Sequence, residues 1–401
     1  MSGSALIIGG GIAGIRASLD LAGMEIPVHL VECKPFLGGA LLQLDRLYPT
    51  DHCAWCPVWP LMRHVGNHPL ITIHSLSEVR SIQGKAGAYQ ATIGHLPTYI
   101  RSERCTGCGE CLKACAKRSP AAGRGGSLPI LKPNSYVLPK GWVIDRNLCG
   151  ECIGCQEACP FKAIDFQMIE EIKIVEISTV ILASGFDPGP LNRLEEYSYG
   201  AHPDIISAME FETWISEWGP NAGQVLRPSD GQKVRHLAFV LCAGSRDRRG
   251  YDYCSAVCCM YAVKEALWAC RRSKDLQATI FFTDLRACGR DFQEYVQSAG
   301  ESGRIQFIRS RPGRIQPGGE RGALQILYED TNARNTQEMN VDMVVLAQPQ
   351  APPRGLEKST FQSGSFACGC CQDPADAVQS VISASAAALR AAETIKGGRV
   401  T

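Results

Sequence analysis

The feature that most constrains the fold of this chain is a pair of closely spaced cysteine runs. Each run has the pattern C-x-x-C-x-x-C-x-x-x-C, and the runs begin at Cys105 and at Cys149. Thiolates are soft donors that suit iron–sulfur clusters, and with this doubled spacing the fourth cysteine of each run ligates the other run's cluster. Zinc is the alternative metal for such a set. The spacing predicts two [4Fe–4S] clusters, one held by Cys105, Cys108, Cys111 and Cys159, and one by Cys115, Cys149, Cys152 and Cys155.

The cysteine content of the whole chain favours metal binding over disulfide bonding. The 401 residues include 20 cysteines, which is too many for a reducing compartment unless they bind metal. The N-terminus runs directly into an apolar strand and a glycine loop, without the features of a signal peptide. We therefore expect a cytoplasmic protein.

Charge and hydropathy argue against binding to nucleic acid and against a segment that crosses a membrane. The 41 Lys and Arg residues nearly balance the 40 Asp and Glu residues, so the net charge gives no basis for binding nucleic acid. No uninterrupted apolar run approaches the roughly 20 residues that cross a bilayer. We expect no direct membrane span, and any contact with a membrane is expected to be made through a partner protein.

A glycine loop at the N-terminus has the sequence context of a dinucleotide-binding site. The apolar strand 5–8 precedes Gly9-x-Gly11-x-x-Gly14, and a helix-compatible segment follows. The first glycine makes the turn, the second lets a pyrophosphate approach the backbone, and the third lets the helix pack on the strand. The phosphates are then expected at the helix N-terminus.

An acidic residue and a second glycine pair indicate which dinucleotide binds. Glu32 ends the second strand, 28–31, where a carboxylate binds a ribose hydroxyl, which favours FAD or NAD over NADP. The pair Gly38-Gly39 resembles FAD-containing flavoproteins with two dinucleotide domains. FAD is the expected cofactor, and NAD is the alternative.

Two later segments are expected to return to the same cofactor. A strand ending in a small-residue turn brings Gly185 close to it, and near the C-terminus Asp373 is expected to cap a helix that begins at Pro374. The residues expected to bind the cofactor are Gly9, Gly11, Ile12, Ala13, Gly14, Glu32, Cys33, Lys34, Gly38, Gly39, Gly185, Phe186, Gly369 and Asp373.

A third group of cysteines stands where a second dinucleotide domain should carry its glycine loop. The strand 237–241 leads to Cys242, and Cys254, Cys258 and Cys259 follow it, without a second G-x-G-x-x-G. Spacing alone leaves two interpretations open, a third cluster in place of a nicotinamide or buried structural cysteines.

The order of these motifs resembles the A subunit of heterodisulfide reductase over nearly the whole chain. It is carried by the glycine loop, the doubled cysteine run, the segment 242–247 and the Cys-x-x-x-Cys-Cys motif at 254–259. The segments 226–231 and 341–347 are similar to the A subunit of the quinone-interacting membrane-bound oxidoreductase, a smaller member of this family. The resemblance implies FAD and a third, atypically ligated [4Fe–4S] cluster on Cys242, Cys254, Cys258 and Cys259.

The same resemblance gives a role to one lysine. Lys264 matches a family lysine placed near the flavin ring, where a cation would stabilise the anionic reduced flavin and so serve catalysis. The alternative is a solvated lysine on a helix surface.

The expected fold is α/β and resembles thioredoxin reductase, with a Rossmann-type FAD domain. A two-cluster ferredoxin-like module is inserted in it, and a degenerate second dinucleotide domain carries the third cysteine group. The expected boundaries are 1–100, 168–231 and 351–401 for the FAD domain, 101–167 for the insert and 232–350 for the degenerate domain.

The expected function is electron transfer within an oxidoreductase complex. The resemblance implies two partners, a related protein with flavin and iron–sulfur groups and a quinone-binding protein in the membrane. Electrons would pass to or from a cytoplasmic reductase of sulfur metabolism such as adenylylsulfate reductase. One alternative is the flavin subunit of a soluble complex that bifurcates electron pairs. Another is a self-contained flavin-dependent disulfide or thiol reductase.

Five further cysteines have no assigned role. Cys53 and Cys56 form a Cys-x-x-Cys pair, and Cys368, Cys370 and Cys371 lie near the C-terminus. A redox-active dithiol beside the flavin and simple packing around the cofactor are both open for these residues.

Overall fold

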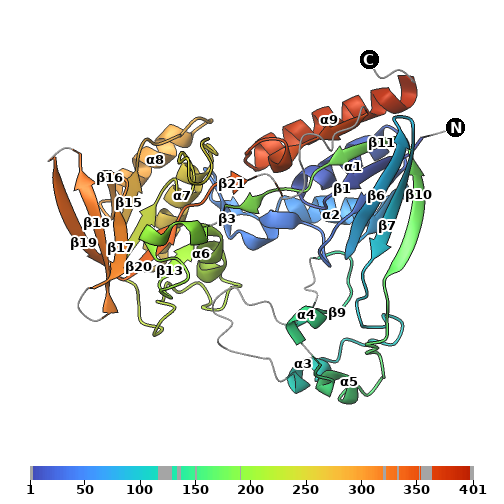
Figure 1. Ribbon diagram of the computed structural model, residues 1–401, viewed down its shortest axis with the longest axis horizontal. Helices are drawn as coiled ribbons and strands as arrows, with labels where there is room; N and C mark the ends of the chain where they lie inside the picture. Colours follow the sequence, from blue (N-terminus) through green and yellow to red (C-terminus); the bar gives the residue numbers. More distant parts are fainter. Residues whose placement is uncertain are drawn as a thin grey trace.

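Two five-stranded parallel sheets with flanking helices organise the chain into two lobes (Figure 1). The strands at the centre of each sheet are short and almost wholly buried, as expected for parallel sheets covered on both faces. This computed structural model describes residues 3–115, 129–132, 137–149, 151–189, 191–318, 322–331, 334–351, 353 and 364–397.

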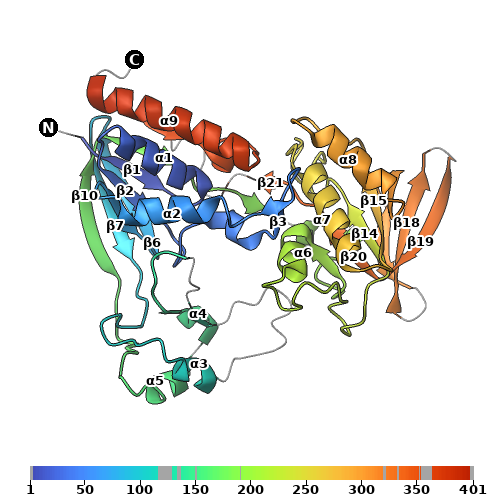
Figure 2. The same ribbon diagram turned by 180° about the vertical axis from the view of Figure 1, so that it is seen from behind.

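The first lobe contains the N-terminal glycine loop. Its parallel sheet has the order β22-β11-β1-β2-β5. Apolar residues of its helices and of one sheet face form one core, and residues of the other sheet face form a second apolar cluster. In both ribbon views α9 runs along α1 (Figures 1 and 2). The elements are β1 (Ala5–Ile8), α1 (Ile12–Gly23), β2 (Val28–Val31), α2 (Val58–Asn67), β5 (Ile71–His74), β11 (Thr179–Leu182), β22 (Ser365–Ala367) and α9 (Ala377–Gly397).

The second lobe repeats this plan. Its sheet has the order β13-β20-β14-β15-β16, so β14 and α7 correspond to β1 and α1 of the first lobe. The elements are β13 (Ile205–Ser207), α6 (Ala208–Ile215), β14 (His236–Val240), α7 (Cys258–Arg272), β15 (Gln277–Phe282), α8 (Phe292–Glu301), β16 (Ile305–Arg309) and β20 (Met343–Leu346).

The strand pairing places the boundary between the two lobes earlier in the chain than expected. Residues 168–231 were expected in the FAD domain, but β13 pairs in parallel with β20 of the second sheet. Ser207 then begins α6 with a capping box, because its hydroxyl accepts from the Glu210 amide while the Glu210 carboxylate accepts from the Ser207 amide. The crossover between the lobes therefore precedes residue 205.

A three-stranded antiparallel sheet begins directly after β5 in the first lobe and directly after β16 in the second. In the first lobe the segment expected to form the ferredoxin-like module lies between β7 and β10, and its described helices project away from both lobes (Figure 1). The antiparallel strands are β6 (Ser77–Lys85), β7 (Ala88–His95) and β10 (Glu171–Ile177), and β17 (Arg314–Pro317), β18 (Leu324–Asp330) and β19 (Asn335–Val341).

Short elements complete the described residues. The module contains α3 (Glu110–Ala114), β8 (Ile130–Leu131), β9 (Val143–Ile144), α4 (Arg146–Cys149) and α5 (Gly154–Glu157). Two-stranded pairs are formed by β3 (Arg46–Leu47) with β4 (His52–Cys53) and by β12 (Asp187–Pro188) with β21 (Gln350–Ala351). Single 3-10 turns are Gly39–Gln43, Leu191–Arg193, Glu195–Tyr197 and Gly369–Cys371.

Within the described ranges, no helix is both long enough and apolar enough to cross a membrane.

Three histidines from neighbouring strands stack inside the first lobe. His29 Nδ1 and His74 Nε2 lie 3.1 Å apart, and the rings of His74 and His95 are 5.2 Å apart. Burial and the other two histidines lower the pKa of His74 to about 3, and burial together with the Lys173 cation lowers the pKa of His29 and His95. The histidines are therefore held in the neutral form near neutral pH.

We predict that the first lobe loses stability in mild acid. The unfolded chain binds protons at these histidines near pH 6.5, whereas the folded chain does not, so stability is present at neutral pH and falls as the pH drops below about 6.5. The melting temperature should be measured between about pH 5 and 7.5. As the pH falls, it should decrease less steeply in His74→Gln than in the wild type. The exposed His64 on α2 supplies the control. A loss in His74→Gln as steep as in His64→Gln would contradict this account.

Candidate functional site

A cleft of about 1160 Å³ is lined by residues from both lobes. Its lining includes Gly9 and Glu32 at the carboxyl ends of β1 and β2, and Lys264 of α7 from the second lobe. Ligands of open α/β sheets bind at the carboxyl ends of the strands. The cleft is large enough for a dinucleotide, since pockets for smaller ligands are generally below about 1,000 Å³.

The floor of the cleft is made by backbone segments that approach one another closely. A Cβ on Gly14 would lie 1.8 Å from the Gly9 carbonyl oxygen, and a Cβ on Gly39 would lie 2.8 Å from the Gly11 Cα. Gly9 also has a φ of 111°, and a Cβ there would lie 2.3 Å from the Ala183 oxygen. Only glycine fits these positions, which leaves the amides at the start of α1 open to a pyrophosphate.

Glu32 is buried and organises the loop. Its Oε2 accepts a hydrogen bond of 2.6 Å from the Gly10 amide, and its Oε1 accepts one of 2.8 Å from the Lys34 amide. The carboxylate is thereby held against the glycine loop at the edge of the cleft, in the position where a ribose would be bound.

Most of the residues expected to bind the cofactor do line the cleft. Gly14 and Gly369 instead pack beneath it, since a Cβ on Gly369 would lie 2.9 Å from the Ala13 Cβ. The expected residues that line it are Gly9, Gly11, Ile12, Ala13, Glu32, Cys33, Lys34, Gly38, Gly39, Gly185 and Phe186.

The assignment of Asp373 was wrong. Its side chain is exposed and does not line the cleft, and α9 begins later than expected. The residue at the helix start is Asp376, whose carboxylate accepts from the Gln379 amide at 2.8 Å while its own amide donates to the Gln379 side chain. Asp376 lines the cleft, so it takes the place that the sequence assigned to Asp373.

Two of the C-terminal cysteines line the cleft, and the third contacts a strand of the first lobe. Cys368 is fully buried, and it lines the cleft together with Cys370. Cys371 donates to the Leu182 carbonyl of β11 at 3.1 Å. These contacts correspond to packing around the cofactor site.

Lys264 is buried at the α7 end of the cleft. Its Nζ donates to the Glu212 carboxylate and to the Arg46 carbonyl, the latter at 3.1 Å. Burial lowers the pKa of the Lys264 ammonium to about 8, against the opposing effects of nearby carboxylates. The ammonium is therefore a paired interior group, and the alternative of a solvated surface lysine is wrong.

A second titratable group beside it was not foreseen from the sequence. Glu265 lines the cleft and is 1% exposed, and its Oε2 has no hydrogen-bond partner among the described residues. Burial raises the pKa of this carboxyl to about 8. At neutral pH the side chain is accordingly a neutral acid that can donate a hydrogen bond into the cleft.

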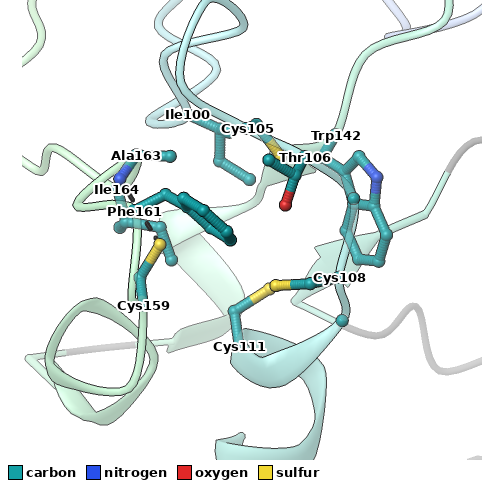
Figure 3. A pocket seen from close by; sticks show the side chains of 12 residues that line it. Ile100, Cys105, Thr106, Cys108, Cys111, Trp142, Cys159, Phe161, Ala163 and Ile164 are labelled. Carbon is teal, nitrogen blue, oxygen red and sulfur yellow. Dashed lines mark hydrogen bonds between the residues drawn. The ribbon is translucent and has the colours of Figure 1, made fainter.

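The first predicted cluster set surrounds a small pocket in the inserted module (Figure 3). Cys105, Cys108, Cys111 and Cys159 all line it, with Ile100, Trp142 and Phe161 around them. The Ala163 amide donates to the Cys159 sulfur at 3.3 Å, an interaction of the kind that tunes a cluster's potential. The fold thus brings the fourth cysteine of the second run to the first three of the first run.

Members of the second set are also close together. The pKa of Cys155 is raised to about 11 by burial and by the neighbouring sulfurs of Cys149, Cys111 and Cys115. Cys111 belongs to the first set, so the two sets are adjacent. Cys152 is exposed.

The third set gathers at the start of α7. Cys258 and Cys259 are its first two residues, and the pKa of the Cys258 thiol is raised by Cys259, by burial, and by Cys242 and Cys254. The Ala256 amide donates to the Cys254 sulfur at 3.3 Å. These cysteines occupy, between β14 and α7, the place that the glycine loop occupies between β1 and α1.

Within the described part of the chain, no group of three or more His, Cys, Asp or Glu side chains is arranged to hold a single metal ion.

Curated proteins similar to this chain are components of heterodisulfide reductases. The chain is 36% identical to the A subunit of the H(2):CoB-CoM heterodisulfide,ferredoxin reductase of Methanothermobacter marburgensis, over 99% of the chain and 64% of that protein. It is 38% identical to the iron-sulfur A subunit of the CoB–CoM heterodisulfide reductase of Methanocaldococcus jannaschii, over 87% of the chain and 54% of that protein. The chain thus spans between half and two thirds of these relatives. No family model matches it.

Solved structures similar to this one confirm the expected fold class. Thioredoxin reductase of Lactococcus lactis matches with a TM-score of 0.54 at 15% identity, covering 98% of this chain and 99% of that one. The bacillithiol disulfide reductase of Bacillus cereus matches with a TM-score of 0.52 at 10% identity, covering 100% of both chains.

We predict that Glu265→Gln removes a pH-dependent cost of folding. The unfolded carboxyl ionises near 4.5, whereas the folded one stays protonated to about 8. The stability that the protonated Glu265 carboxyl contributes is therefore fully present below about pH 4.5 and is lost as the pH rises through about 8. Relative to the Gln variant, the wild-type melting temperature should fall across this range. Glu294→Gln, at an exposed site on α8, is the control, and parallel curves for wild type and Glu265→Gln would disprove the assignment.

Proposed function

Because this chain is a homologue of the heterodisulfide reductase A subunits, we propose that it is an oxidoreductase subunit that transfers electrons through FAD and iron–sulfur clusters. The observation that carries the proposal is that α7 contributes residues both to the third cysteine set and to the cleft. This helix begins with two cysteines of the third set and, one to two turns later, contributes Lys264 and Glu265 to the cleft. A cluster at its start and a flavin in the cleft would be neighbours.

The residues of the cleft fit FAD. The amides that follow Gly11 would hold the pyrophosphate, Glu32 would bind the ribose, and Gly185, whose φ is 78° with no atom near its Cβ position, leaves room for close approach. FAD exchanges electrons in pairs whereas each cluster exchanges one, so the combination connects two-electron and one-electron partners. The chain itself contributes the neutral acid of Glu265 and the Lys264–Glu212 ion pair at the inner end of the cleft.

We propose further that the complex links a quinone-binding membrane protein to a reductase of sulfur metabolism, such as adenylylsulfate reductase. This finer assignment is supported by the similarity of segments 226–231 and 341–347 to the A subunit of quinone-interacting oxidoreductases. A related protein with flavin and iron–sulfur groups is the second partner that this assignment requires.

A second candidate is a flavin subunit that bifurcates electrons in a soluble complex. It is favoured by the names of the relatives, which include heterodisulfide,ferredoxin reductases. In that case one electron of each pair would be delivered to a low-potential acceptor such as ferredoxin.

We predict about twelve irons per FAD in anaerobically purified protein, since three [4Fe–4S] clusters contain twelve. Cys258→Ser should lower the count toward eight because it removes one ligand of the third cluster. Cys270→Ser changes another buried cysteine of the same helix and should leave the count unchanged. A count of eight in all three proteins would restrict the clusters to the inserted module.

The two candidate complexes are separated by their electron partners. For the quinone-linked complex, the tagged chain should purify with the membrane fraction of its native cells, and a quinol should bleach its flavin absorbance. Recovery from the soluble fraction alone, with reduction of ferredoxin during turnover, would favour the bifurcating complex. The matched control is the same preparation with the membrane partner removed by detergent washing, which should lose quinol-dependent bleaching.

A further inference from the structure

The Cys-x-x-Cys pair lies on a hairpin that joins the two lobes. Cys53 is the last residue of β4 and pairs directly with Arg46 of β3. Cys53 is half-buried, and Cys56 is exposed after the turn that follows. Both ribbon views place β3 between the lobes (Figures 1 and 2). The pair belongs to none of the three cysteine sets assigned above.

The two thiols are neighbours on the hairpin, three positions apart in the sequence. The interaction with Cys53 is the main reason that the pKa of Cys56 is raised. Both are free thiols in this structure. Two cysteines separated by two residues on a turn can form a disulfide when their side chains turn toward each other.

The hairpin is a fixed support for this pair. Between β3 and β4, Asp51 accepts hydrogen bonds from Trp268 at 3.1 Å, from Arg271 at 2.6 Å and from Tyr295 at 2.5 Å. These partners lie on α7 and α8 of the second lobe. The carbonyl of Arg46, opposite Cys53, accepts from the Lys264 ammonium. The dithiol is therefore held one strand away from a residue that lines the cleft.

We propose that Cys53 and Cys56 form a redox-active dithiol that exchanges with a low-molecular-weight disulfide. Cys56 is the accessible sulfur, so it is the attacking thiol, and Cys53 resolves the intermediate. A low-molecular-weight disulfide is the expected substrate because it needs to reach only the exposed Cys56 sulfur.

The exchange balances without a cofactor. The Cys56 thiolate attacks one sulfur of the substrate disulfide, forms a mixed disulfide and releases the first thiolate. Cys53 then attacks the Cys56 sulfur, which forms the Cys53–Cys56 disulfide and releases the second thiolate. Two electrons pass from the pair to the substrate, and the two thiol protons are taken up by the two released thiolates. Excess dithiol reverses the reaction.

One tryptic peptide isolates the pair. Cleavage after Arg46 and Arg63 yields residues 47–63, whose cysteines are Cys53 and Cys56 alone. The purified full-length protein is incubated anaerobically with oxidised glutathione, quenched in acid and alkylated. The wild-type peptide should lose the mass of two hydrogen atoms and take up no alkylating label, and dithiothreitol should restore both.

Two variants and an internal control define the roles. Cys53→Ser should accumulate glutathione on Cys56, and Cys56→Ser should show neither a disulfide nor rapid glutathione uptake. Exposed Cys288 is the sole cysteine of residues 287–290 and should at most form a mixed disulfide that does not resolve. A wild-type peptide that stays fully alkylated, or that stops at the mixed disulfide, would overturn the proposal. The measurement does not involve FAD or iron, so it can fail or succeed independently of the proposed electron-transfer function.

Discussion

The cleft depends on polar contacts that tie the 45–51 segment of the first lobe to helices of the second. Asp45 accepts from Arg272 at 2.8 Å, and its amide donates to Glu212 of α6 at 2.9 Å. Both charged side chains of the Asp45–Arg272 pair are largely buried. Losing one partner of such a pair leaves an uncompensated charge in the interior, which costs on the order of 3–5 kcal/mol. The contact therefore joins the two lobes that supply the cleft walls.

The two lobes show how one topology serves two kinds of ligand. In the first lobe, the turn between strand and helix is glycine, because the backbone must pass within contact distance of Gly39 and Ala183. In the second lobe, the equivalent turn is longer and carries Cys242, with a φ of 57°, and Cys254 before α7 begins. Side-chain sulfurs there replace the bare amides that a phosphate needs. The exchange of glycine for cysteine at one topological position would exchange a nucleotide for a metal cluster.

Features that depend on local spacing were predictable from the sequence. The glycine loop and the crossing of Cys159 to the first cysteine run are set by short motifs whose geometry is fixed wherever they occur. The start of α9 was missed because Asp373-Pro374 has the sequence of a helix start. In the structure the residue at the helix start is Asp376 instead, which is held by reciprocal hydrogen bonds with Gln379. The place of β13 was missed because a three-residue strand is too short to show a hydrophobic pattern. Its pairing with β20 also joins residues that are far apart in the sequence.

The inner end of the cleft could not be foreseen, because its chemistry depends on how three titratable groups from two helices meet. The sequence suggested a lone cation at Lys264. In the structure that cation is paired with Glu212 from α6 and with a carbonyl from β3, so its field inside the cleft is largely cancelled. Glu265, with no partner for one oxygen among the described residues, is held neutral by burial. The net charge of the three groups is then close to zero. A reduced flavin placed there would be stabilised less by a neighbouring positive charge than by the hydrogen bond that a protonated acid can donate.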